Sequence, residues 1–506
     1  MKHALDHRRL SRLPLRPLSL RRSLPSLLSL SLSLSLALSS AFSGCASTPG
    51  TGPQEPPAPP QTLADRWQAP LPAGGGETGA DIDADIARWW QRFDDPLLPP
   101  LVRAAQAASP TLASAAARIE RARATRVAAG AGLLPSVNAV GSANQGRRVL
   151  GVPVAGNASL GLQAAWEIDL FGGGAAGRDA AQARLEGAQA GWHDVQVSVA
   201  AEVATSYASL RACEAQRTQA EADAESRAQT ARLTDLSARA GFTAPADAAL
   251  ARASAAQGRN QAVSQRAACE TQLKSLVELT DTPEAELRQR LAGRTAQVPV
   301  PPTLAVPTLP AALLSRRPDL AEAARNVLAA AGDRVQAQAA ERPRLSLGGS
   351  LAAATLRSAG TTTTGSTWAI GPLSVTFPLF DAGTAAAATS AARAEYDAAV
   401  AVYQAQVRRA LREVEAALVA LQSSSERQAD ASSAAQDFEA SLRATEARQK
   451  GGLASLFDLE AARRSALAAQ SALTDLQRER VAAWISLYRA LGGGFDAAAL
   501  NTTAAR

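Results

Sequence analysis

The chain has 506 residues, enough for two or three ordinary domains. It contains one Met, three Cys and three His. Because His3 and His7 lie in the first ten residues, a mature protein would keep only His193. This inventory argues against a histidine-based metal site and leaves a single imidazole for acid–base chemistry. Ala-rich stretches with Arg, Glu, Gln and Leu indicate long helices.

The formal charge of +6 comes from the N-terminus. Residues 1–44 hold seven basic side chains against Asp6 alone. Without them, 52 − 7 = 45 basic and 46 − 1 = 45 acidic residues remain. The rest of the chain is therefore neutral, and its charge gives no reason to expect a nucleic-acid partner.

The N-terminus has the pattern of a bacterial lipoprotein signal. A basic stretch is followed by an apolar Ser/Leu run and by small residues before Cys45. A transmembrane helix is the alternative, but serines dilute the apolar run. Phe42 stands where such signals usually have Leu, and Ala46 resembles the second residue of lipoproteins sent to the outer membrane. We predict a signal peptide over 1–44, lipid on Cys45 and a lipid-anchored N-terminal tether over 45–96. Residues 46–80 of this tether are rich in Pro, Gly and Thr and are expected to be flexible.

The remaining chain is one unit written twice, because its two halves match at an offset of about 208 to 211 residues. Residues 169–172 correspond to 378–381, for example. Each half is predicted to run helix, strand, strand, very long helix, turn, long helix. The predicted units are a first repeat over 97–297, a Pro-rich linker over 298–310, a second repeat over 311–494 and a tail over 495–506.

The predicted strands alternate between apolar and polar side chains. Leu160–Leu170 has its apolar residues at even positions, and Arg344–Leu351 and Leu373–Leu379 show the same period of two. Trp368 and Ile370 are out of phase, which predicts a bulge or bend at Gly371-Pro372. With Ser136–Asn144 as the weakest, these strands are about 9–12 residues long, which suits a tilted strand crossing a membrane.

Four such strands cannot close a barrel, since the smallest single-chain barrels have eight. Lipid does not tolerate an open sheet edge. A membrane barrel would therefore be shared between chains. The alternative is a soluble, half-buried sheet, but the flanking helices offer no globular core to cover one face.

The predicted helices are very long. Residues 173–240 contain no Pro, and 384–450 contain neither Pro nor Gly. At 1.5 Å per residue, nearly 70 residues would reach ~100 Å. Apolar residues, mostly Ala with Leu and Val, recur every three to four positions and favour close coiled-coil packing.

These features resemble the outer-membrane efflux proteins of the TolC/OprM type, in particular their lipid-anchored branch. The motifs that carry the resemblance are WQRFDDPL at 90–97, WEIDLFG at 166–172, SRRPDL at 315–320, GPL…FPLFDAG at 371–383 and LYRALGGG at 487–494.

This resemblance implies an α+β membrane protein that forms a homotrimer. Three chains would close a 12-stranded barrel of four transmembrane strands per chain above a 12-helix coiled-coil tunnel. It also implies an outer-membrane location with extension into the periplasm. The partners would be a periplasmic adaptor and an inner-membrane pump of the RND type, with no catalysis and no cofactor.

In this family, acidic residues and their Arg partners near the periplasmic tip hold the entrance closed, often in a Leu-Asp-Ala-x-Arg pattern. The resemblance points to Asp458, Glu460, Arg463 and Arg464 as the gate. Counted without gaps, the Asp of the pattern falls on Ala461. The alternative for each residue is a solvated polar helix face.

Cys213 lies 29 residues before the predicted turn near Phe242, and Cys269 lies 27 residues after it. The two should lie nearly level in an antiparallel hairpin. An oxidising periplasm would then permit a disulfide. The alternative is two buried thiols on separate faces.

Three other motifs have structural explanations. Gly172–Gly177 fits G-x-G-x-x-G, but the alternating strand before it is unlike a dinucleotide site, and the glycines would let the chain pass from sheet to helix. Around Arg316-Arg317, Pro318 and Asp319 suit a helix first turn better than an anion site. His193 follows Trp192 and is expected to pack rather than catalyse.

The leading interpretation is a passive exit duct for drugs, metals or other small molecules. A channel for type I protein secretion is the nearest alternative, and a pore-less periplasmic coiled-coil scaffold is a remote one. No nucleophile–base pair or metal cluster indicates an enzyme.

Overall fold

The computed structural model describes residues 66–71, 90, 93, 95–147, 154–301 and 316–495, all within one compact unit, Gln54–Arg506. The predicted signal peptide, Cys45, most of the linker and residues 496–506 lie outside the described residues.

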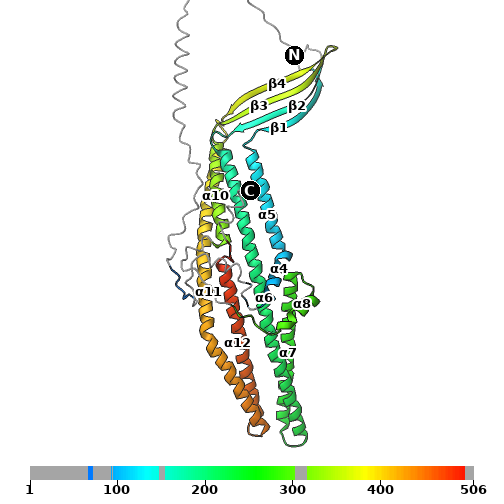
Figure 1. Cartoon of the computed structure of the whole chain (residues 1–506), viewed down its shortest axis with the longest axis vertical. Helices are drawn as coiled ribbons and strands as arrows, with labels where there is room; N and C mark the ends of the chain where they lie inside the picture. Colours follow the sequence, from blue (N-terminus) through cyan, green and yellow to red (C-terminus); the bar gives the residue numbers. More distant parts are fainter. Residues whose placement is uncertain are drawn as a thin grey trace, which may run out of the picture. The chain divides into compact units, whose positions relative to one another are not determined.

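Both halves follow the predicted order of elements (Figure 1). The first half contains α4 Leu98–Ala108, α5 Pro110–Ala131, β1 Ser136–Gly146, β2 Ala155–Ile168, α6 Gly173–Arg239, α7 Pro245–Thr280, α8 Glu284–Leu291 and the 3₁₀ turn η1 Ala292–Arg294. The second half contains α10 Pro318–Ala340, β3 Arg344–Ser358, β4 Thr361–Thr376, α11 Thr384–Lys450 and α12 Leu456–Ala490. The pieces α8 and η1 have no counterpart in the sequence-based prediction.

The two long hairpins match residue for residue. Helices α6 and α11 both have 67 residues, and each hairpin turn spans five residues. Because Gly173 and Thr384 begin these helices, the offset between the repeats is 384 − 173 = 211. The internal repeat predicted from the sequence is therefore present in the structure, with a constant offset of 211 residues through both hairpins.

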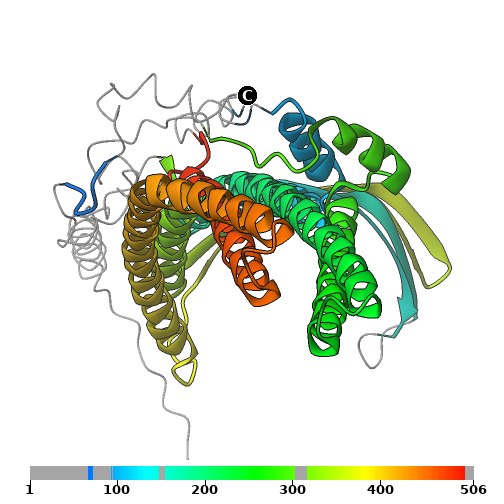
Figure 2. The same cartoon turned by 90° about the horizontal axis from the view of Figure 1, so that it is seen from below.

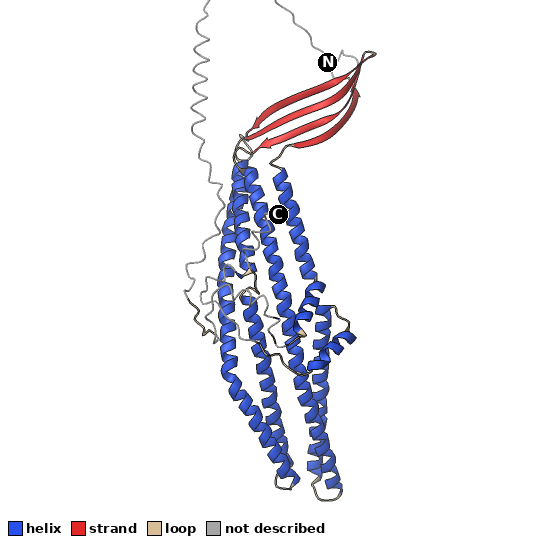
Figure 3. Ribbon diagram, in the orientation of Figure 1, coloured by secondary structure: helices blue, strands red, loops and turns tan. Residues whose placement is uncertain are grey.

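The four strands form one antiparallel sheet in the order β1-β2-β3-β4 (Figure 3). Strand β2 pairs with β3, with Leu162 opposite Leu351, and this pairing joins the two repeats. No described strand pairs with the outer edge of β1 or of β4. The predicted bulge is present, since Leu347 pairs with Leu373 while Gly349 pairs with Ile370.

The predicted strand length holds for β1 and was too short for β2, β3 and β4. The strands have 11, 14, 15 and 16 residues, because β3 and β4 stay paired up to a two-residue turn at Ala359-Gly360. Both turn residues have a positive φ, of 48° and 81°. The strand ends at Thr376, so the predicted extension through Phe377 and Leu379 was wrong. Those two side chains lie beyond the sheet and are exposed.

The helices pack against one another along their length. Helix α6 contacts α5, α7, α10 and α12, and α11 contacts α10 and α12. Seen from below, the orange turn end of the α11–α12 hairpin lies beside the green turn end of the α6–α7 hairpin (Figure 2). Among the described helices, none is both long and apolar enough to cross a membrane.

The main hydrophobic core lies midway along α6 and α11 and includes Trp90 and Phe93 of the motif at 90–97. Trp90 donates from Nε1 to the Tyr488 hydroxyl at 3.2 Å, and the Tyr207 hydroxyl donates to Asp95 at 2.6 Å. Arg211 is fully buried and donates from Nε to the Tyr207 hydroxyl at 3.1 Å. A buried guanidinium that keeps its partners fixes how the elements around it sit.

Part of the predicted flexible tether is packed against this core. Trp67 and Ala69 are buried, and the backbone N–H groups of Gln68 and Ala69 donate to the Glu415 carboxylate at 2.8 and 2.9 Å. One carboxylate on α11 thus holds two consecutive amides. Residues 66–71 are therefore an ordered contact of the helical body, which Pro/Gly/Thr-rich composition did not predict.

Candidate gate at the hairpin ends

Each long hairpin closes through a glycine with left-handed backbone. Gly241, between α6 and α7, has φ +81°, and Gly452, between α11 and α12, has φ +74°. Such a φ is costly for residues with a side chain, so glycine ends the helix and lets the chain turn back. The beginning of α12 lies beside the last turns of α6 and the first turns of α7. A buried polar cluster forms where they meet.

Glu460 is the centre of this cluster and is 8% exposed. Its Oε2 accepts a hydrogen bond from Ser254 Oγ on α7 at 2.6 Å and one from Arg227 Nη1 on α6 at 2.9 Å. Its Oε1 accepts from Arg463 Nη1, one turn along α12, at 3.1 Å. A buried carboxylate with three charge-assisted or short partners is well compensated, and it joins both hairpins.

Arg463 extends the cluster to a fourth helix. Its Nη2 donates to Ser226 Oγ at 2.8 Å and to Thr230 Oγ1 at 2.9 Å, both on α6, and lies 3.6 Å from Glu446 on α11. On the other side, Arg227 Nε donates to Asp223 Oδ2 at 2.7 Å. We name Asp223, Arg227, Ser254, Glu460 and Arg463 the hairpin latch.

Asp458 does not belong to the hairpin latch. It forms a capping box with Ser455, whose N–H donates to the Asp458 carboxylate at 2.9 Å, while Ser455 Oγ accepts from the Asp458 N–H at 3.1 Å. The Ser455 hydroxyl also donates to the Asp458 carboxylate at 2.7 Å, and this bond together with the one from the Ser455 N–H holds the pKa of Asp458 below its usual value. Its local role is to start helix α12.

Arg464 is exposed, and no described side chain pairs with it. The structure therefore brings together Glu460 and Arg463 of the four predicted gate residues, and leaves Asp458 and Arg464 apart from them. It also corrects the motif alignment at Ala461. Leu459-Glu460-Ala461-Ala462-Arg463 has the spacing of Leu-Asp-Ala-x-Arg with Glu in place of Asp, and the carboxylate contacts the Arg as that spacing requires.

Sequence reasoning missed the latch partners on the first hairpin. Arg227 and Ser254 are 233 and 206 residues away from Glu460 in the chain. Nothing local marks them, because Arg, Ser and Thr recur throughout these helices. The strict offset of 211 gives the usable signal, since it aligns the two hairpins and predicts which turns of α6 and α7 lie level with the beginning of α12.

Farther from the turns, Cys213 on α6 and Cys269 on α7 are joined in a disulfide with their Cα atoms 5.5 Å apart. Both cysteines are buried, and Gln265 Nε2 lies 3.4 Å from Cys213 Sγ. The level placement expected from the antiparallel hairpin is present.

The glycines of the G-x-G-x-x-G match serve the passage from sheet to helix. Gly172 has φ +74° as the residue before α6. A Cβ on Gly173 would lie 2.6 Å from Ala339 Cβ, and one on Gly177 would lie 2.9 Å from Gln336 Nε2. Close approach of α6 to α10 therefore explains Gly173, whereas a Cβ on Gly174 would lie 2.7 Å from Leu133 Cδ2.

The Arg316–Asp319 motif starts α10, as predicted, and adds an unpredicted buried cation. Pro318 is the first helical residue and Asp319 lies in the first turn. Arg317 donates from Nη2 to Asp319 at 2.7 Å and to Glu413 at 2.9 Å, and from Nη1 to the Ala490 carbonyl at 3.1 Å. It ties α10, α11 and the end of α12 together.

His193 packs between aromatic rings. Its ring centroid lies 5.0 Å from that of Trp192 and 5.2 Å from that of Phe495. Burial lowers the pKa of this imidazole. Within the described ranges, no group of three or more His, Cys, Asp or Glu side chains is arranged to hold a metal ion.

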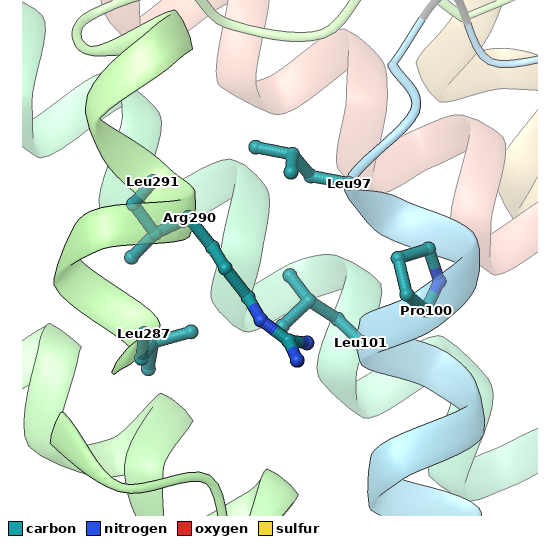
Figure 4. A pocket seen from close by; sticks show the side chains of 6 residues that line it. All are labelled: Leu97, Pro100, Leu101, Leu287, Arg290 and Leu291. Carbon is teal, nitrogen blue, oxygen red and sulfur yellow. The ribbon is translucent and has the colours of Figure 1, made fainter. Parts of the chain in front are cut away.

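A small apolar notch lies between α4 and α8, away from the hairpin latch. Leu97 and Leu101 on one side face Leu287 and Leu291 on the other, and the Arg290 side chain extends between the two sides (Figure 4). It has no polar group arranged for chemistry and serves as packing between the two short helices.

Comparison with known proteins gives a consistent result. The family model described as outer membrane efflux protein matches residues 101–281 and 309–493. The chain is 29% identical over 433 residues to the pyoverdine export outer membrane protein OpmQ of Pseudomonas aeruginosa, which covers 83% of this chain and 90% of the relative. It is 27% identical over 452 residues to the solvent efflux pump outer membrane protein SrpC of Pseudomonas putida, covering 88% and 94%.

Solved structures share the fold of long helical coiled coils with four antiparallel strands. The outer-membrane channel OprN is 29% identical, with a TM-score of 0.77 over 87% of this chain and 98% of that chain. The CmeC outer membrane channel of Campylobacter jejuni, at 23% identity, has a TM-score of 0.76 over 87% and 98% and supports the fold alone. Because the family model spans both repeats and more than half of the chain, the protein belongs to the outer membrane efflux protein family.

Proposed function

We propose that three copies of this chain form a passive outer-membrane exit duct of a tripartite efflux pump. The observation that carries the proposal is that no strand among the described residues pairs with the outer edge of β1 or of β4. Lipid does not tolerate unpaired strand edges, and four strands are too few for one chain to close a barrel. Pairing β1 of one copy with β4 of the next satisfies both edges, and three copies give 12 strands.

Small molecules are the proposed cargo. The relatives at 27–29% identity are named for pyoverdine export and for solvent efflux, and another, ArpC of Pseudomonas putida, for antibiotic efflux. Type I protein secretion remains the second candidate. It would gain support if the chain replaced a secretion channel and failed to replace an efflux channel in the same host.

The hairpin ends are the proposed docking site for a periplasmic adaptor, which connects the duct to an inner-membrane pump of the RND type. Three large apolar side chains are strongly exposed there: Phe242 is 87% exposed, Leu453 is 73% exposed and Phe457 is 67% exposed. Such side chains on both turns favour a protein partner at this end. The hairpin latch just behind them is the proposed gate.

Cys45 is the proposed lipid anchor, on the strength of the signal pattern that precedes it. Metabolic labelling with palmitate should mark the wild-type protein in the outer-membrane fraction. Label that persists after Cys45→Ser would contradict the anchor, and it would leave the channel proposal untouched.

Assembly tests the duct itself. In mild detergent the purified protein should have about three times the mass of the mature chain, because four strands per chain and 12 per closed barrel require three copies. A stable, dispersed monomer would contradict the shared barrel. Transport is tested in a host that lacks its own efflux channel, where the chain together with its adaptor and pump should restore resistance to small toxic compounds.

A further inference from the structure

The disulfide and the hairpin latch lie on the same pair of helices. Arg227 lies 14 residues after Cys213 along α6, and Ser254 lies 15 residues before Cys269 along α7. At about 1.5 Å per residue, both latch donors lie about 20 Å from the bond, toward the turn. Cys213 thus lies opposite Cys269, and Arg227 lies opposite Ser254, on the same two antiparallel helices.

Donation by both groups to one carboxylate depends on the register between α6 and α7. Arg227 Nη1 contacts Ser254 Oγ at 2.9 Å, and both contact the same oxygen of Glu460. A slip of one residue would move Ser254 by about 1.5 Å along α7 and about 100° around it. The three-way contact would then be lost, although each helix would remain intact.

Between the bond and the latch, α6 and α7 are joined by the exposed ion pair of Arg266 with Glu221 and by a hydrogen bond from Gln265 to Gln216. Exposed pairs of this kind contribute little to stability. The apolar contacts there come from Ala220, Ala224 and Ala262. Gly258 allows very close approach, since a Cβ there would lie 2.8 Å from Arg227 Cδ. Small, uniform side chains lack the large knobs that specify register in coiled coils. A covalent bond supplies what this packing lacks.

The second hairpin has no such bond. At the offset of 211, Cys213 and Cys269 correspond to Ser424 and Arg480. Ser424 is fully buried and donates to the Leu421 carbonyl of its own helix at 2.9 Å. The bond is thus specific to the hairpin that presents the donors to Glu460, while Glu460 itself comes from the hairpin without one.

We propose that the Cys213–Cys269 disulfide is a register clamp that holds Arg227 and Ser254 in place for Glu460. Reduction by a dithiol would convert the bond to two thiols while the dithiol is oxidised to its own disulfide. The hairpin latch would then weaken without any change to its own residues. Weakening of the gate as a consequence rests on the proposed channel function.

A double-mutant cycle tests the clamp without any transport assay. Hydrogen exchange of residues 456–466 would be followed in the purified full-length protein as wild type, Cys213→Ser/Cys269→Ser, Glu460→Gln and the three changes together. Removing the bond should speed exchange at least about threefold in the wild-type background and leave it nearly unchanged with Glu460→Gln, because the latch is already broken there. Ser254→Ala can replace Glu460→Gln as the second change in the cycle. Removing the bond should then again have little effect on exchange in the Ser254→Ala background.

Three outcomes separate the proposals. An equal speeding of exchange in both backgrounds, or no speeding in either, would overturn the clamp. Ser424→Ala, the matched change in the second hairpin, should leave exchange at 456–466 unaltered, and a threefold effect there would also count against it. A further outcome is that the removal of the bond and Glu460→Gln are coupled in hydrogen exchange while single-channel conductance stays the same in all the variants. That result would support the clamp and contradict the gate assigned under the proposed function.

Discussion

The hairpins α6–α7 and α11–α12 share one backbone plan and differ in how their ends are held. Their first helices have equal lengths, and both turn through a glycine with positive φ. The first hairpin carries the disulfide and begins α7 at Pro245 without a side-chain cap. The second begins α12 with the Ser455–Asp458 capping box. A repeated backbone therefore does not imply repeated contacts, and the functional differences are in single side chains.

Arg463 and Arg252 show this most clearly, because they are equivalent at the offset of 211. Arg463 is 4% exposed and contacts Glu460, whereas Arg252 is more than half exposed and pairs with Asp235. At the position equivalent to Glu460 the first hairpin has Ala249. The second hairpin thus contributes a buried carboxylate–guanidinium pair to the latch, whereas the equivalent positions of the first hairpin form a solvated helix face.

Arg463→Ala should have the largest effect. It leaves the buried Glu460 with one charged partner fewer, and breaking a buried pair costs about 3–5 kcal/mol. The free energy of local opening, measured by native-state hydrogen exchange at the beginning of α12, should fall by that order. Arg252→Ala is the matched control and should cost at most about 1 kcal/mol, since exposed pairs contribute little. Equal costs would remove the distinction between the two hairpins.

The disulfide should come next. Thiol counting on the unreduced, unfolded protein should find neither Cys213 nor Cys269 reactive. Loss of the bond should lower stability by about 2–5 kcal/mol, as for other native disulfides. Two alkylatable thiols in protein purified without reductant would show that the bond does not form in the cell.

Two aspartates should respond to pH with opposite signs. Burial and the nearby Asp319 carboxylate raise the pKa of Asp194 on α6, whereas Ser455 lowers the pKa of Asp458 on α12. The stabilising contribution of Asp194 to the free energy of unfolding is fully present below the unfolded pKa of about 3.9. It is lost as pH rises through the folded pKa. At Asp458, stability is present above about pH 3.9 and is lost as pH falls through the folded pKa.

At neutral pH, Asp194→Asn should therefore slow local hydrogen exchange, and Asp458→Asn should speed exchange in the first turn of α12. Exchange profiles of both variants across acid pH would check this. The same sign of change in both would contradict the assigned environments.

Arg464→Ala should have the smallest effect. The side chain is exposed, and it has no partner among the described residues. Hydrogen exchange at the beginning of α12 and single-channel conductance should both match the wild type. A clear rise in conductance would restore Arg464 to the gate, in contact with another copy of the chain.

Periodicity and breakers predicted the architecture well, because they are local signals. The order of elements, the long helices and the bulge at Gly371-Pro372 all follow from residues close together in the chain. Strand ends were less predictable, since the tight turn at Ala359-Gly360 let pairing continue beyond the predicted length.

The candidate site was only half predictable. Family resemblance pointed to Glu460 and Arg463, whereas their partners Arg227 and Ser254 are more than 200 residues away and have ordinary local sequence. Asp458 and Arg464 were included because spacing along one helix cannot distinguish a cap or an exposed cation from a buried pair. Which face of α12 meets α6 is decided by tertiary packing, and that information is not local.

Single-channel recording in a planar bilayer tests the central claim most directly, that this chain forms an outer-membrane duct closed by the hairpin latch. The purified wild-type protein should form a small, mostly closed conductance. Arg463→Ala should raise the open conductance or open probability, and the equivalent Arg252→Ala should leave both unchanged. No conductance from any of the three proteins would contradict the duct. Equal conductance in all three would contradict the latch as its gate.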